Sequence, residues 1–141
     1  MRKNLIAGFT LIELLVVVAI LGVLSAVGVI AFGSYTTSTK MSAATNTMQQ
    51  ISLAQTEYFT DSDTYYAYGA TCTPNKTTTE DIIDKDNGLD VPIAYQDIAF
   101  YFCVEGDGTD YTIRALSDYG SKDCKITFTR VDQKAVRSDE C

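Results

Sequence analysis

An uninterrupted apolar run at residues 14–32 limits most strongly what this chain can fold into. Ser25 is the only polar side chain in the run. A helix of this length spans the hydrocarbon core of a bilayer. Glu13 stands directly before the run, and the next formal charge is Lys40. A carboxylate in hydrocarbon costs several kcal/mol and usually has a function, so the sequence predicts a membrane-length helix that holds Glu13 for a positively charged partner.

A short basic segment precedes the apolar run. Arg2 and Lys3 place this end in the cytoplasm by the positive-inside rule. A cleaved secretory signal peptide is the competing interpretation, but its apolar region is shorter and would not carry a glutamate. No small-residue cleavage site of the usual kind follows Phe32. We therefore predict a single-pass membrane segment.

The helical pattern continues beyond the apolar run. Met41, Ala44, Met48, Ile51 and Tyr58 recur at the spacing of one helix face. No proline or glycine interrupts residues 34–60. One helix over residues 9–59 is predicted, whose first half needs lipid or other helices around it and whose second half needs a globular partner.

The rest of the chain predicts a loop followed by a small antiparallel sheet. Residues 61–95 are predicted to be a loop with little regular structure. Residues 98–104 are aromatic and β-branched, and residues 105–108, Glu-Gly-Asp-Gly, are a strong turn signal. Two further strands are predicted at residues 111–115 and 124–128, with a fourth candidate near residues 135–136. The predicted fold class is α+β, a long N-terminal helix packed against an antiparallel sheet of three to four strands.

Charge and cysteine content limit the functions that the chain can have. It has 11 basic and 18 acidic residues, a net charge of −7 that becomes −9 without Arg2 and Lys3. This balance argues against direct nucleic-acid binding, which needs clustered basic residues. Residues 57–110 are strongly acidic and residues 111–141 are not, an asymmetry that can steer self-association.

The four cysteines all follow the apolar run and suggest two disulfides in an oxidising compartment. Three pairings are open. We favour Cys72–Cys103 and Cys124–Cys141, because the second closes a polar terminal loop and is worth about 3 kcal/mol in the chain-entropy model.

Neither catalysis nor a cofactor is predicted. The chain has no histidine, no G-x-S-x-G motif and no P-loop. Two acidic segments, residues 84–90 and 105–110, resemble calcium loops only faintly, because both lack the glutamate at the twelfth position. We expect a surface loop and a hairpin turn there, with no metal. Asn75-Lys76-Thr77 fits the glycosylation sequon, a weak signal on its own.

Two features of the apolar segment bear on assembly. If the chain were cut before Phe9, the new amino group would lie about one helical turn from Glu13 and could pair with it in the same chain or in a neighbour. Gly22, Gly28 and Gly33 either let helices pack closely or let the segment unwind, since each costs roughly 1 kcal/mol of helix propensity.

Residues 8–13, Gly-Phe-Thr-Leu-Ile-Glu, with the basic leader before them and the apolar run after them, closely resemble the class III signal and N-terminal helix of bacterial type IV pilins. The C-terminal part, from Tyr111 through Cys124 to Cys141, is similar to PilE-like pilins of the type IVa kind. One departure is Ile30, where many family members have a proline.

The resemblance implies a processing site between Gly8 and Phe9, cleavage by prepilin peptidase, N-methylation of Phe9, and pairing of Glu13 with the Phe9 amine of an adjacent subunit. It implies partners: other pilin subunits, the peptidase, an inner-membrane assembly platform, and lipid before assembly. The expected organisation is a leader (1–8), a transmembrane and filament-core half-helix (9–33), an amphipathic half-helix (34–60), an αβ-loop (61–97), and a sheet with a disulfide-closed loop (98–141).

The expected function is that of a structural filament subunit, inserted in the inner membrane and then exported to the cell surface. Adhesion, twitching motility and DNA uptake are all open roles for such a filament. Two alternatives stay open. Type II secretion pseudopilins share the N-terminal motif, although the four cysteines and the incomplete acidic loops count against that class. A membrane-anchored periplasmic enzyme or binding module is the third hypothesis.

Overall fold

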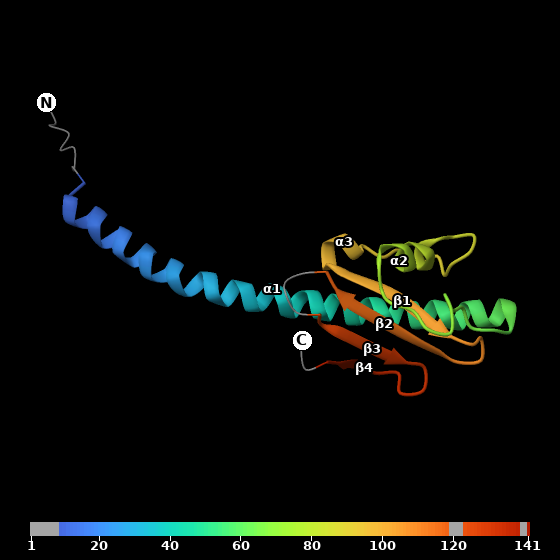
Figure 1. Cartoon of the computed structure of the whole chain (residues 1–141). Helices are drawn as coiled ribbons and strands as arrows, with labels where there is room; N and C mark the ends of the chain where they lie inside the picture. The colour runs from blue at the N-terminus through green and yellow to red at the C-terminus, as the bar shows by residue number, and fades with distance from the viewer. Residues whose placement is uncertain (1–8, 119–122, 139–140) are drawn as a thin grey trace, which may run out of the picture. The chain divides into compact units, whose positions relative to one another are not determined.

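The computed structural model describes residues 9–118, 123–138 and Cys141. The fold class is α+β, as predicted (Figure 1). The elements are α1 (Leu11–Ser62), α2 (Lys76–Ile83), α3 (Tyr95–Ile98), β1 (Phe100–Gly106), β2 (Tyr111–Ser117), β3 (Lys125–Thr129) and β4 (Ala135–Arg137). The chain divides into two compact units, Met1–Ser38 and Thr39–Cys141, which are described separately.

The first unit contains the apolar part of α1. Within the described residues, α1 is the one helix that is long and apolar enough to cross a membrane. Its large apolar side chains, where described, are 48% to 80% exposed, so no described part of the chain covers them. The helix starts two residues later and ends three residues later than predicted. Thr10 caps its start, and at its other end Asp63 adopts a left-handed backbone conformation (φ 58°).

The second unit is built around a sheet in which we find four antiparallel strands among the described residues, in the order β1-β2-β3-β4. Residues 39–62 of α1 run beside this sheet (Figure 1). The stripe of Met41, Ala44, Met48 and Ile51 is buried in one core with the inward side chains of the strands, which confirms the predicted face. The strand residues in this core are Phe100, Phe102, Val104, Tyr111, Ile113, Ala115, Ile126 and Phe128.

Helix α2 corrects the prediction of an irregular loop at residues 61–95. Asn75 caps the helix: its side chain accepts from the backbone N of Thr78, and the Thr78 hydroxyl accepts from the backbone N of Asn75. Ile82 is fully buried in the core. A threonine run has poor helix propensity, so the capping box and the buried side chains explain why this segment is helical.

The predicted turn at residues 105–108 is also wrong in its position. Glu105 and Gly106 belong to β1, where they pair with Thr112 and Tyr111. The chain reverses at residues 107–110, where Gly108 has a positive φ of 89°. Gly106 is needed because an added Cβ would lie 2.3 Å from the carbonyl oxygen of Asp110. β1 also begins later than predicted, because residues 95–98 form α3 and Ala99 is left-handed (φ 52°).

Two disulfides close loops in the second unit. Cys72 is bonded to Cys103, with the Cα atoms 6.3 Å apart, and ties the segment before α2 to β1. Cys124 is bonded to Cys141, with the Cα atoms 4.5 Å apart, and encloses β3 and β4.

Candidate assembly site

The predicted assembly residues lie at the start of α1, Phe9 just before the helix and Glu13 within it. Phe9 is 77% exposed, and Glu13 lies in the first turn of the helix. The Glu13 carboxylate accepts hydrogen bonds from the backbone N (2.8 Å) and the hydroxyl (2.7 Å) of Thr10. Gly8, Arg2 and Lys3 lie outside the described residues.

Thr10 is a site residue that sequence reasoning missed. Its hydroxyl accepts from the backbone N of Glu13 (3.3 Å), so the two residues cap each other. Thr-x-x-Glu before an apolar run is the sequence signature of a capping box, and this signal was present at residues 10–13. The chain therefore supplies local hydrogen-bond donors for Glu13, in addition to the positively charged partner that the sequence predicts. These hydrogen-bond donors orient the carboxylate but do not neutralise its charge.

The three glycines of the apolar segment lie in continuous helix. An added Cβ at Gly22, Gly28 or Gly33 would meet no atom within 4 Å, so packing inside this chain does not require any of them. The carbonyl of Gly33 accepts from the hydroxyls of Thr36 (2.9 Å) and Thr37 (3.2 Å). That the three glycines serve in packing against other helices or in unwinding stays a prediction.

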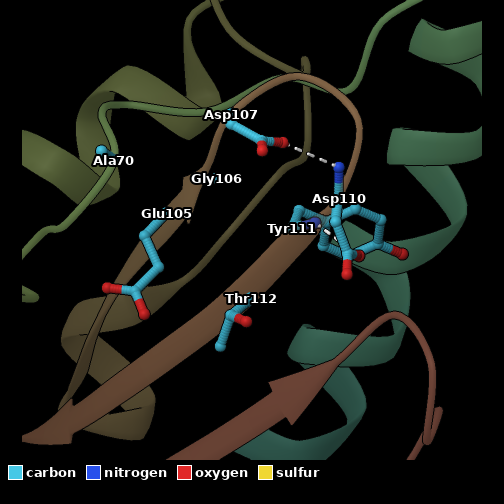
Figure 2. Close-up of a pocket in the computed structure, with 7 residues that line it drawn as sticks. All are labelled: Ala70, Glu105, Gly106, Asp107, Asp110, Tyr111 and Thr112. Carbon is cyan, nitrogen blue, oxygen red and sulfur yellow. Dashed lines mark hydrogen bonds between the residues drawn. The ribbon is translucent and has the colours of Figure 1, made fainter.

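A second cluster of charge lies where β1 turns into β2. Figure 2 shows Glu105, Asp107 and Asp110 around a pocket of about 370 Å³. Asp107 accepts from the backbone N atoms of Thr109 (2.9 Å) and Asp110 (3.2 Å). Asp110 accepts from Arg130, and Glu105 forms an ion pair with Arg114. These carboxylates are thus occupied by donors of the protein itself, and no group of three or more metal-binding side chains occurs in the described part of the chain.

These contacts lower the pKa values of the carboxyls. The hydrogen bond from Arg114 holds the pKa of Glu105 below its ordinary value, and Arg130 does the same for Asp110. The hydroxyl of Thr109 lowers the pKa of Asp107. The cluster is charged at neutral pH and serves to order the turn.

Gln55 is a buried polar residue that joins α1 to the segment after it. Its side-chain nitrogen donates to the carbonyl of Tyr66 (2.8 Å), and its oxygen accepts from the backbone N of Tyr66 (2.9 Å). Gln55 is fully buried. The apolar stripe has a gap between Ile51 and Tyr58 in which Gln55 falls, so its spacing on the helix could have signalled a buried amide.

Aromatic side chains fix the end of α1 to the same segment. Phe59 stacks on Tyr65 (ring centroids 4.5 Å apart), and Tyr58 makes an edge contact with Tyr66 (5.9 Å). Tyr66 also donates to Asp81 of α2, and burial raises the pKa of its hydroxyl. These tyrosines therefore pack the chain against itself.

Comparison with known proteins gives a consistent result. A family model described as "Prokaryotic N-terminal methylation motif" matches residues 3–29. The chain is similar to "Fimbrial protein EcpC" of Eikenella corrodens, 39% identical over 70 residues, which are 50% of this chain and 46% of that protein. It is also similar to "Type IV major pilin protein PilA" of Myxococcus xanthus (strain DK1622), 40% identical over 58 residues, which are 41% of this chain and 26% of that protein.

The motif, these relatives and the α+β fold support a type IV pilin. The aligned part spans less than half the length of each of the two curated relatives. No solved structure matches the chain significantly. The N-terminal methylation motif and the apolar part of α1 fit a membrane-anchored precursor.

Proposed function

We propose that this chain is a structural subunit of a type IV pilus. The observation that carries the proposal is an apolar helix whose side chains are left uncovered by the residues that the structure describes, with an exposed Phe9 and a single capped carboxylate at its start. Such a surface is stable only in lipid or among other apolar helices. The methylation motif over the same residues supports the second environment as the final one.

The proposed sequence of events starts with the precursor anchored in the inner membrane. Prepilin peptidase cuts between Gly8 and Phe9 and creates an amino group at Phe9, which is then methylated. Assembly moves the helix from lipid into a bundle of like helices, where the amine of one subunit neutralises Glu13 of its neighbour. A charge buried without a partner is strongly unfavourable, so this pairing selects a single axial register. The second unit, with its sheet and both disulfides, forms the outer part of the extracellular filament.

The test of this function is electron microscopy of filaments sheared from the cell surface, with mass spectrometry of their subunits. The chain should be recovered as a major or minor component, with an N-terminal peptide that begins at methylated Phe9. Filaments that lack the chain would contradict the proposal. A peptide beginning upstream of Phe9 would contradict the processing step.

Replacing the carboxylate tests the assembly mechanism. We expect Glu13→Ala to leave the amount of protein in the membrane unchanged and to lower the yield of sheared filament by more than about tenfold, since a lost charge pair in an apolar bundle costs a few kcal/mol. Ser25→Ala, a change at the other polar position of the same segment, is the control and should assemble normally. Normal filament yield from Glu13→Ala would rule out charge pairing as the basis of assembly.

A further inference from the structure

The second unit carries an open groove with an apolar floor and an acidic rim. The groove has a volume of about 420 Å³ and lies between the last turns of α1 and the segment that joins α2 to α3. Leu53 on its floor is a large apolar side chain that is 73% exposed, on the face of α1 opposite the buried Ile51 and Gln55. Ala54, Val91 and Pro92 complete the apolar lining. Glu57 and Asp90 supply carboxylates at the groove.

The groove is preorganised by buried anchors. Leu89 and Val91 are 8% and 4% exposed, so the segment that forms one wall is held by the core. A wall that is already ordered does not lose conformational freedom when a ligand binds.

The hairpin between β3 and β4 has exposed apolar side chains with basic neighbours, which complement the acidic groove. Val131 at its turn is 73% exposed, and Val136 on β4 is 60% exposed. Its charges are mostly basic: Asp132 is acidic and Arg130 pairs with Asp110, while Lys134 and Arg137 accompany the valines. No ion pair of either cation occurs among the residues that the structure describes.

The two surfaces lie at opposite edges of the same sheet. The hairpin belongs to the β4 edge, whereas α2 and α3, which flank the groove segment, contact β1 (Figure 1). A hairpin therefore reaches the groove of another copy and not that of its own chain. Contact between two different patches is heterologous, and repetition of such a contact without closure generates a helical filament.

We infer that the β3–β4 hairpin of one copy docks in the Leu53 groove of a second copy, with Val131 on the apolar floor and Lys134 beside Glu57. The inference rests on the proposed function, because the N-terminal helices must first bring the copies together. Once they do, even a weak contact becomes effectively intramolecular. The basic hairpin and acidic groove make the pairing directional and disfavour hairpin-to-hairpin contact.

A photo-cross-link in filaments from cells expressing the full chain tests the contact directly. Val131 is replaced by p-benzoylphenylalanine, sheared filaments are irradiated, and the cross-linked peptides are identified by mass spectrometry. Capture of residues 50–57 or 89–92 of a second copy is the expected result. Filaments that contain the chain but show capture elsewhere, capture of a different protein, or no capture overturn the inference and leave the proposed function standing. Absence of the chain from filaments overturns both.

Exchange of charges provides an independent test. Glu57→Lys and Lys134→Glu should each lower filament yield by up to about fivefold, as expected for an exposed ion pair, and the double variant should recover most of the loss. The matched control combines Lys134→Glu with Asp97→Lys, the same charge change at an exposed residue of α3 outside the groove, and should show no recovery. A double variant no better than the worse single variant contradicts the contact.

Discussion

At the scale of single residues, the interior is organised by a few polar side chains that satisfy backbone groups. Gln55 is the clearest example, because its amide forms two hydrogen bonds with the backbone of Tyr66 inside the core. Buried backbone groups without partners are costly. One side chain therefore determines where the segment after α1 returns to the helix.

Truncation of this amide should destabilise the second unit strongly. Gln55→Ala leaves a buried N–H and a buried carbonyl unpaired, and we expect a loss of about 2–4 kcal/mol in the free energy of unfolding. The measurement is chemical denaturation of the full chain in detergent, followed by circular dichroism. Gln49→Ala, an exposed position on the same helix, is the control and should change stability by less than about 0.5 kcal/mol. A loss of similar size in both variants would contradict the role assigned to Gln55.

At the scale of elements, the long helix and the sheet could be predicted, but α2 could not. The α1 stripe from Met41 to Ile51 has a clear helical period, and β2 and β3 largely alternate in burial, so local pattern and tertiary structure agree there. The run Thr77-Thr78-Thr79 has no such pattern. Its helix depends on contacts with β1, 23–24 residues away in the sequence, which no local signal contains.

The same distinction between local and long-range contacts applies to the candidate assembly site and to the groove. Phe9 and Glu13 belong to a local sequence motif, and the Thr10–Glu13 capping box could also be predicted from it. The groove at Leu53 was not, because it forms only when residues 89–92 fold back beside α1.

The hydrogen bond between α2 and β1 should contribute measurably to the stability of the second unit. The Thr79 hydroxyl accepts from the backbone N of Phe102 (2.8 Å) in a fully buried position. Thr79→Val keeps the shape and removes the acceptor, so we expect a loss of about 1–3 kcal/mol. Faster hydrogen exchange at the Phe102 amide would report the effect locally. Thr77→Val, an exposed position in the same helix, is the control and should leave that amide protected; equal exchange in both variants would contradict the assignment.

At the scale of the whole molecule, acidic side chains dominate the charge, and those at the β1–β2 turn link stability to pH. The pKa values of Glu105, Asp107 and Asp110 are lowered in the folded state. Carboxyls with a lowered folded pKa stabilise the fold above their unfolded pKa of about 4, and this stabilisation is lost as the pH falls through the folded pKa. The second unit should therefore lose stability on acidification below about pH 4.

Glu105→Gln tests this linkage. The variant should be less stable than the wild type at pH 7 by about 1 kcal/mol, and its stability should depend less on pH between about pH 2 and 4. Denaturation at a series of pH values measures both effects. Arg114→Gln should reproduce the change. The stability of the double variant should depend on pH as much as that of either single variant, because the two residues form one pair. An unchanged pH slope in Glu105→Gln would contradict the assignment.

The two disulfides also set how far the second unit can lengthen under a mechanical load. A force applied at Cys141 passes across the bond to Cys124 and bypasses β3 and β4, which lie inside a loop of 17 residues of sequence separation. The second bond removes the span between Cys72 and Cys103, 31 residues in separation, from any extension. Each residue so enclosed takes away about 3.6 Å of attainable length. Under tension, extension on the C-terminal side of Cys72 would then be confined to the stretch between Cys103 and Cys124, which contains most of β1 and all of β2.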